Sequence, residues 1–442
     1  MSVTAGAWVV LAGATLMGSF RRPAWALALY MLTFFAAPQL WWWGNEIPSL
    51  RYAFWAGVVL LASVLWHLSR SPEDVGRRVT VVHVAAVGMV LNAAFVHLVF
   101  ASAPAFSFKE WVELLKFVLL FFLIWAAIQS RDDLRVALVA IAAGAAYIGF
   151  EVTINGRGDF GGARLEGVGA PGADTSNGLA CLMLTVLPLV GSLFVNGRKR
   201  EKILSIVAAP LALNVLLLCN SRGAFLGLIG AGLCFLAIAR GSTRKMAIRT
   251  LVLGSVALYA LLGDPEIFGR FMTTFTGSEE RDNSAASRIE FWRAGLLMLT
   301  DYPLGAGGGS FKFVHGGDYL SEVVGSDVDG RSLHNGYLTE ATDWGVQGLI
   351  LKLLFFGAAM IAANKTSNRC RLHSDVQGAL LGICLIVAAG GLLIGSIFGS
   401  FLGNEWGYWV VGLLVRYSEL YRPVASAAEV GGVNIPGAQV AA

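Results

Sequence analysis

Long apolar runs recur along almost the whole of this 442-residue chain. Each run has roughly the 17–25 residues that an α-helix needs to cross the ~30 Å hydrocarbon core of a bilayer. Hydrophobic residues make up 56% of the chain and charged residues only 14%, far less charge than a soluble domain of this length carries. The alternating segments of about ten residues that a transmembrane β-barrel requires do not occur in the sequence. We therefore expect an all-α, polytopic integral membrane protein.

The apolar runs predict about 12–13 transmembrane helices. The predicted spans are 5–20, 24–43, 52–68, 79–101, 111–129, 133–150, 177–196, 203–219, 223–239, 247–262, 336–363, 376–398 and a short one at 403–416. Arg21 and Arg22 follow the first span without the polar cleavage region of a signal peptide, so this span is interpreted as a membrane segment. Trp41, Trp42 and Trp43 end the second span, where they are predicted to form an aromatic belt at the membrane interface.

Basic residues fall in every second connection between the predicted spans. They are Arg21, Arg22, Arg70, Arg77, Arg78, Arg131 and Arg135, together with those of 197–202, 240–245 and 364–371. The positive-inside rule places these connections in the cytoplasm. The long polar stretches 151–176 and 263–335 then face outward, and a loop as long as the second is usually functional.

The same pattern gives the expected organisation of the chain. Its parts are N-terminal transmembrane helices at 1–150, transmembrane helices with an outer loop (151–176) and an SRG motif at 151–262, a periplasmic loop domain of short helices at 263–335, C-terminal transmembrane helices at 336–418, and a flexible tail at 419–442.

The sequence gives no indication of a metal site or a bound cofactor. None of the five cysteines forms a CxxC pair, and no two of the six histidines have the i,i+4 spacing of metal ligands on a helix. A P-loop of the form GxxxxGK[ST] is also absent, so ATP-driven transport is not supported. We expect no cofactor, no metal and no nucleic-acid partner.

Arg222 is the most informative single position in the first half of the chain. It lies between two apolar spans in the sequence NSRGAFLGLIGAG (220–232), at the outer interface. Gly223 and Gly227 would let another backbone approach closely. Arg222 could bind an anion there, or it could simply mark a helix end by reaching toward headgroups and water.

Arg288 is the second arginine that could bind an anion. It opens a segment with an apolar face that predicts a short helix, with Asn283 or Ser284 as its N-cap. Arg288 would then lie near the helix start, where backbone N–H groups favour anions. The alternative is a surface arginine that pairs with Glu290.

His334 ends the second outer loop, directly before a membrane span. A histidine can accept a proton near neutral pH, although a lone histidine at such a boundary is more often just an interfacial polar residue. If the next helix included residue 334, a rotation of ~100° per residue would point Asp343 nearly opposite His334. Asp343 would then need a partner elsewhere in the bundle, because an unpaired acid at depth is unfavourable.

Three motifs carry a family resemblance. In order, they are SRGAFLGL (221–228), SRIEFWRAGLLMLTDYPLGAGGGSF (287–311) and LHNGYLTEATDWGVQGLI (333–350). With these motifs the chain resembles the O-antigen ligase and Wzy-type polymerase superfamily, over about 170–360 and in its multi-span layout. The third motif is the most specific, because His334-Asn335 is followed after nine residues by Gly345, with Asp343 at the family's frequent acidic position. The segment that begins at Arg164 also resembles the family.

The resemblance implies a GT-C-like, metal-independent glycosyltransferase of the bacterial inner membrane, with its active site facing the periplasm. Its donor would be a glycan on undecaprenyl diphosphate, and its acceptor a hydroxyl of lipid A-core, of another glycan or of a protein. Arg222 and Arg288 would engage the donor's diphosphate, and His334 would activate the acceptor hydroxyl or orient the donor. The further substrate-binding residues implied are Arg164, Asn335 and Asp343.

Three functions are weighed on this basis. A ligase is favoured, and a polymerase that extends the glycan comes next, because short motifs do not encode an acceptor pocket. The more distant alternative is a polysaccharide transporter, for which paired broken helices with buried ions in both halves would be expected. The polar residues of this chain concentrate instead in one outer region of its second half, which favours an enzyme.

Overall fold

The computed structural model describes residues 1–70, 77–160, 164–262, 279–324 and 331–422. Its helical segments are α1 (Val3–Ser19), α2 (Pro23–Phe35), η1 (Pro38–Leu40), η2 (Gly44–Glu46), α3 (Tyr52–Arg70), α4 (Val81–Phe100), α5 (Pro104–Ala127), α6 (Arg131–Thr153), α7 (Ser176–Asn196), α8 (Lys199–Leu218), α9 (Arg222–Ile238), α10 (Ser242–Leu262), α12 (Glu279–Asp301), η4 (Phe311–His315), α13 (Gly316–Val324), α14 (Gly336–Leu372), α15 (Val376–Gly395) and α16 (Glu405–Leu420). Of the described residues, 79% are helical. In the described ranges its only strand-like pairing is an isolated bridge between Asp159 and Glu166.

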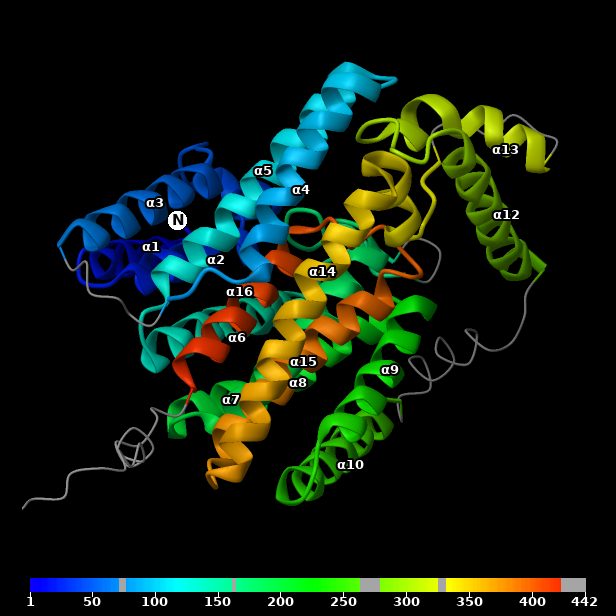
Figure 1. Cartoon of the computed structure of the whole chain (residues 1–442). Helices are drawn as coiled ribbons and strands as arrows, with labels where there is room; N and C mark the ends of the chain where they lie inside the picture. Colours follow the sequence, from blue (N-terminus) through cyan, green and yellow to red (C-terminus); the bar gives the residue numbers. More distant parts are fainter. Residues whose placement is uncertain (71–76, 161–163, 263–278, 325–330, 423–442) are drawn as a thin grey trace, which may run out of the picture.

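Each predicted span coincides with a helix of the structure (Figure 1). In the described part of the chain, 8 helices are long and apolar enough to cross a membrane. They are α2 with the turn that follows it, α3, α4, α6, α7, α8, α14 and α15. The apolar helices α1 and α9 are shorter, at 17 residues each. The protein is therefore an all-α polytopic membrane protein, as expected.

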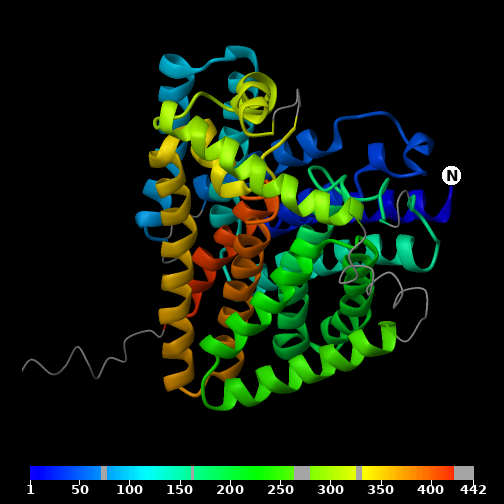
Figure 2. The ribbon, with the colours of Figure 1, turned by 90° about the vertical axis from the view of Figure 1, so that its right-hand side faces the viewer.

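The expected division of the chain falls partly on residues that the structure does not describe. Of the predicted periplasmic loop domain, 263–278 and 325–330 lie outside the described residues, and the rest forms α12, η4 and α13. Figure 1 and Figure 2 show α12 and α13 beside the start of α14, at one end of the molecule. The predicted flexible tail lies outside the described residues from position 423 onward.

Helices α7 and α15 form the centre of the bundle. Within their apolar windows, 78% and 89% of the residues are buried, whereas α3 has 22% and lies at the periphery. Helix α9 packs closely on α15, because a Cβ atom at Gly227 would lie 3.6 Å from the carbonyl oxygen of Gly391. The expected close backbone approach is thus found at Gly227, while Gly223 packs against the side chain of Phe398.

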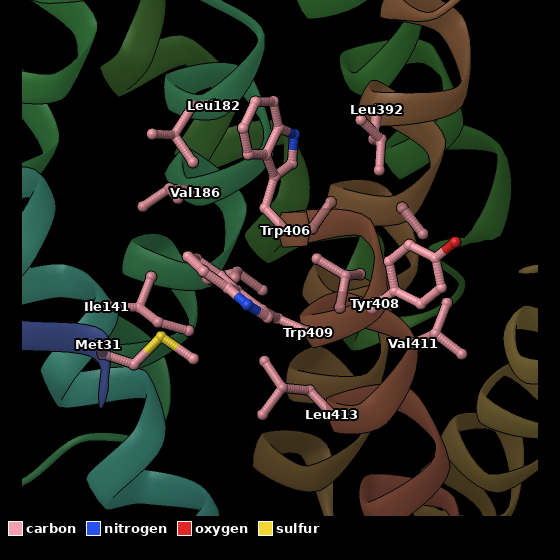
Figure 3. Packing of buried hydrophobic residues seen from close by; sticks show 14 of the residues in the cluster. Met31, Ile141, Leu182, Val186, Leu392, Trp406, Tyr408, Trp409, Val411 and Leu413 are labelled. Carbon is pink, nitrogen blue, oxygen red and sulfur yellow. The ribbon is translucent and has the colours of Figure 1, made fainter. Parts of the chain in front are cut away.

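Aromatic side chains anchor the last helix, α16, in this core. Figure 3 shows Trp406 and Trp409 pointing among apolar side chains of neighbouring helices. The Trp409 ring meets Phe34 of α2 edge-on, with 4.5 Å between the ring centroids. Such rings bury a large apolar area, so they hold α16 firmly although it has only 16 residues. The loop before α16 is held too, since Gly336 N–H donates a hydrogen bond of 2.7 Å to the carbonyl of Ser396.

The predicted interfacial belt of Trp41, Trp42 and Trp43 is wrong for two of its members. Trp41 and Trp43 are 6% and 0% exposed, inside the core, and only Trp42 is largely exposed at 42%. The Trp43 indole donates a hydrogen bond of 2.7 Å to the hydroxyl of Tyr147. The reason is local: α2 ends at Phe35, and the turn that follows directs the chain back onto the bundle.

Helix α14 is broken at Gly345. Its φ of 79° and ψ of 170° are not helical, so α14 consists of two helices joined at this residue. A break inside a membrane leaves backbone carbonyls that need new partners. The carbonyl of Trp344 accepts a hydrogen bond of 2.8 Å from the Asn92 side chain, and Pro303 accepts one of 3.1 Å from Val346 N–H.

The glycine-rich loop between α12 and η4 fills the break. Ala306 and Gly307 donate backbone hydrogen bonds of 2.9 and 3.0 Å to the carbonyls of Thr342 and Asp343. A Cβ atom at Gly305 would lie 2.5 Å from the backbone nitrogen of Gly345, so no side chain fits there. The sequence GAGGGS therefore provides both the space and the donors that a broken membrane helix requires.

A buried ion pair also spans the break. Lys352 Nζ lies 3.4 Å from a carboxylate oxygen of Glu340, and their side chains are only 1% and 8% exposed. In a straight helix these residues, twelve positions apart, would be separated by about 18 Å along the axis. The pair can therefore form only because the helix bends at Gly345. The Lys352 ammonium also donates a hydrogen bond of 2.7 Å to the Tyr408 hydroxyl of α16.

The first prediction concerns the glycine at the break. Gly345→Ala should lower the melting temperature of the purified protein clearly. A residue with a side chain is disfavoured by ~1–3 kcal/mol at this combination of φ and ψ, which is essentially confined to glycine, and its Cβ would lie 2.5 Å from the carbonyl carbon of Leu304. Gly357→Ala is the matched control in the same helix, because its Cβ meets nothing within 4 Å. Equal melting temperatures for the two variants would contradict this account of the break.

The second prediction concerns the ion pair. Lys352→Met leaves the Glu340 carboxylate buried without its partner, so it should destabilise the protein by up to ~3–5 kcal/mol. The double variant Lys352→Met/Glu340→Gln removes both charges and should recover most of that loss in a thermal unfolding measurement. A double variant no more stable than the single one would show that the pair does not stabilise the bend.

Candidate active site

Three arginines come from different parts of the chain to one place beside the start of α14. Arg222 is the first residue of α9, which Ser221 caps by accepting a hydrogen bond from Ala224 N–H. Arg288 lies in α12. Arg164 lies in the loop before α7, where the neighbouring Leu165 N–H donates a hydrogen bond of 3.0 Å to the carbonyl of Leu218, directly before the α8–α9 turn.

The guanidinium groups of Arg164 and Arg222 lie within electrostatic range of Arg288. Burial lowers the pKa of Arg288, and the positive charges of Arg164 and Arg222 lower it further. All three side chains are half-buried. Within the described ranges, neither Arg222 nor Arg288 forms an ion pair with a carboxylate. Arg222 and Arg288 carry like charges near each other, and they favour an anion because an anion would relieve their repulsion.

Helix α12 brings Arg288 to the segment that carries His334. Arg288, Phe291 and Gly295 share one face of α12, since they are three and seven residues apart. The Phe291 ring stacks on the imidazole of His334 with 6.3 Å between centroids. Leu333 fits against Gly295, where a Cβ atom would lie 2.6 Å from the leucine side chain.

The structure corrects the predicted start of this helix. The described part of α12 begins at Glu279, so Asn283 and Ser284 lie inside the helix and do not cap it. Arg288 is therefore more than two turns from the helix start, and its backbone surroundings do not add the anion preference expected of an N-terminus.

His334 lies just outside α14, in a left-handed backbone conformation with φ of 49°. The helix itself begins at Gly336 and is capped by Asn335, whose side-chain oxygen accepts hydrogen bonds from the N–H groups of Tyr337 (3.0 Å) and Leu338 (3.1 Å). His334 is therefore not part of the helix that carries Asp343, so helix geometry does not force the two side chains to opposite faces. Asn335 has a structural task that the sequence analysis did not foresee.

His334 has an environment that favours its neutral form. Burial lowers its pKa below the ordinary 6.5, and the nearby positive charges of Arg288 and Arg331 lower it further. A neutral imidazole at pH 7 can accept a proton or a hydrogen bond. In the described part of the chain the ring makes no hydrogen bond with another protein group, so its nitrogens are available to a ligand.

Asp343 lies apart from the arginines, in the first half of the broken helix. It is buried, and Ser310 of the glycine-rich loop donates a hydrogen bond of 3.4 Å to its carboxylate. Ser310 is therefore a partner of Asp343 within the bundle. Asp343 also lines a cavity of about 770 Å³ that extends to Lys352 and Tyr408.

Two parts of this arrangement were missed in the sequence. One is Lys352, which lies in an apolar run, where a basic residue at depth could have been recognised as a signal for a buried acidic partner. The other is the glycine-rich loop, which was interpreted only as turns. Its four glycines in five residues could have indicated close backbone packing. Among the described residues, no group of three or more His, Cys, Asp or Glu could hold a metal ion.

The class of protein defined by these features is a helical membrane protein with a cationic site at the start of one broken helix. Comparison with protein families shows what this region resembles. Residues 180–353 match the family model described as O-antigen ligase, which supports a relation of this region to the O-antigen ligase and Wzy superfamily. The resemblance of the motifs is thereby confirmed for the part of the chain that carries Arg222, Arg288 and His334. A search of curated proteins gives no match.

The third prediction follows from the charges around His334. In protein labelled with ¹³C at histidine, the His334 signal, assigned by its loss in His334→Gln, should titrate below pH 6.5 in an NMR pH series. Arg331→Gln removes one nearby positive charge and should therefore raise the pKa of His334. The control is Arg293→Gln, which removes an exposed charge from α12 and should leave the titration unchanged. A His334 pKa at or above 6.5 would contradict the proposed electrostatics.

Proposed function

We propose that this protein is a membrane glycosyltransferase of the O-antigen ligase type. It transfers a glycan from undecaprenyl diphosphate to a hydroxyl of lipid A-core or of a protein. The observation that carries the proposal is the cluster of Arg164, Arg222 and Arg288 beside a histidine whose pKa is lowered. The family match over residues 180–353 supports the proposal, because an O-antigen ligase joins a glycan from a donor to an acceptor.

The arginines suit a lipid diphosphate as donor and leaving group. When the bond between the anomeric carbon and the phosphate oxygen breaks, negative charge develops on the diphosphate. Guanidinium groups stabilise that charge through fixed, bidentate hydrogen bonds, and held donors of this kind contribute strongly to catalysis. Three such groups can take the role that a divalent cation has in other transferases, so the proposed reaction is metal-independent.

His334 suits the acceptor side of the same reaction. In its neutral form the imidazole accepts the proton of the acceptor hydroxyl as the oxygen attacks the anomeric carbon. The new glycosidic bond forms while the bond to phosphate breaks, and the undecaprenyl diphosphate leaves with the bonding electrons. A direct displacement of this kind inverts the anomeric configuration.

The side of the membrane on which the reaction is proposed to occur follows from the connections between helices that are rich in arginine and lysine. If the positive-inside rule holds for this chain, the start of α14 and the three arginines face the periplasm of a bacterial inner membrane. The apolar helices beside them would accommodate the lipid tail, and the helical architecture is then of the GT-C-like type. The part of the chain between 263 and 335 would act as a periplasmic loop domain over the site.

The fourth prediction tests the site directly. With purified protein and lipid-linked donor, His334→Ala should reduce glycan transfer by about 10²–10⁴-fold, and Arg288→Ala by about 10²–10³-fold. Both variants should remain folded in the membrane. Arg293→Ala is the matched control, because Arg293 is an exposed arginine of the same helix. Full transfer activity in both site variants would refute the assignment of the site.

Product analysis in a strain that lacks the protein separates the possible acceptors. Loss of capped lipid A-core indicates a ligase, and loss of protein glycosylation indicates a protein O-glycosyltransferase. Shortened glycan chains would indicate the alternative of a Wzy-type polymerase, which the family match also accommodates. Lipid-linked glycan of full length that fails to reach the outer side would indicate a transporter and contradict the proposal.

A further inference from the structure

A polar cavity lies next to the His334 segment. This cavity of about 770 Å³ is lined by Ser332, Leu333 and Gly336, the residues on either side of His334, and reaches Lys352 in the second half of α14. Arg164, Arg222 and Arg288 do not line it. Its volume is in the range of about 300–1,000 Å³ that is typical of small-molecule sites. The cavity and the arginine cluster are therefore separate spaces that adjoin the same short segment.

The lining of the cavity combines charged groups with aromatic rings. Five carboxylates, among them Glu110, Glu340 and Asp343, and four lysines, among them Lys352, line it together with aromatic rings such as Trp344 and Tyr408. Ionisable residues at this depth in a membrane protein usually mark a substrate or ion pathway. A lipid tail would not suit such a lining, because it would strip the charged groups of water without offering them hydrogen bonds.

Carboxylates line the cavity both on α5 and on the first half of α14. Asp343 interacts electrostatically with Glu110 of α5 and with Glu340 one turn earlier on α14. Glu340 is already paired with Lys352, whereas Asp343 receives a long hydrogen bond of 3.4 Å from the Ser310 side chain and one from the backbone of Gly309. A carboxylate accepts up to about four hydrogen bonds, so Asp343 and Glu110 retain capacity for hydroxyl donors.

We infer that this cavity binds sugar rings of a substrate glycan, with Asp343 and Glu110 accepting hydrogen bonds from its hydroxyl groups. The aromatic rings offer flat apolar faces on which the C–H face of a sugar ring can lie. A diphosphate suits the arginine cluster better than this cavity, because five carboxylates line the cavity against four lysines, and one of these lysines is already paired with Glu340. The lipid diphosphate and the sugars of the substrates are thus bound at two different places next to the His334 segment, the arginine cluster and the cavity.

This inference rests on the proposed function for the identity of the glycan. A sugar in the cavity can come from the acceptor or from the donor chain. In both cases the sugar lies close to the segment that carries His334, because Leu333 and Gly336 line the cavity. Glu110 and Asp343 are then residues that bind and orient the substrate, and they take no proton in the reaction.

Binding of lipid-free glycans to the full-length protein in nanodiscs tests the inference without relying on turnover. One probe is the oligosaccharide released by mild acid from the lipid-linked glycan of the source cells. The other is the core oligosaccharide released from lipid A of the same cells. Saturation-transfer NMR should detect binding of at least one probe to the wild-type protein, and the probe that binds identifies the source of the sugar.

Asp343→Asn and Glu110→Gln should each weaken this binding by about tenfold or more, equivalent to ~1.4 kcal/mol. Glu110 lies in the first part of α5 and is only half-buried, so its variant remains informative if Asp343→Asn fails to fold. Arg288→Ala should leave the binding of a glycan without diphosphate unchanged. The matched control is Glu322→Gln, which alters an exposed carboxylate of α13 and should also have no effect.

The outcomes separate this inference from the proposed function. If the wild-type protein transfers glycan from the lipid-linked donor but binds neither probe, or binds it equally well in both carboxylate variants, the inference is overturned and the proposed function stands. If a probe binds in a manner sensitive to Asp343 and Glu110 but no transfer occurs, the sugar site stands and the proposed function fails.

Discussion

The break of α14 at Gly345 is the constraint on which the rest of the site depends. A membrane helix cannot leave its carbonyls without donors, so the glycine-rich loop before η4 must enter the break and supply them. That requirement fixes the position of the loop, and with it the end of α12 from which the loop emerges. The bend in turn brings Glu340 within reach of Lys352 and turns the first half of α14 toward the cavity. The place of His334 is therefore set by backbone geometry and not by its own contacts alone.

Charge is distributed around this segment in two distinct ways. The guanidinium groups of Arg164 and Arg222 lie within electrostatic range of Arg288, whose pKa is lowered by burial and then by these two positive charges. Such an arrangement is unfavourable until an anion binds, and it is consistent with a site built for a strongly charged leaving group. On the other side, acidic and basic groups alternate with aromatic rings around the cavity that contains Asp343. A substrate with a diphosphate at one end and neutral sugars at the other matches both environments at once.

The sequence predicted the helices well because the length and polarity of an apolar run determine whether it can span a bilayer, independently of the rest of the chain. It also singled out Arg222, Arg288 and His334, which the structure brings together, while their roles stay predictions. It failed where the outcome depends on tertiary contacts. The burial of Trp43 follows from the turn after α2, and the capping role of Asn335 follows from a helix start that periodicity cannot locate to a residue.

A structure of the full-length protein in nanodiscs with its lipid-diphosphate donor bound, determined by electron cryomicroscopy, tests the central claim most directly. The account predicts density for the diphosphate within hydrogen-bond distance of the guanidinium groups of Arg222 and Arg288. The first sugar of the donor should then lie beside the imidazole of His334. A diphosphate bound elsewhere would contradict the account, for example at Arg22 and Arg135 beside the apolar cavity between α2 and α6.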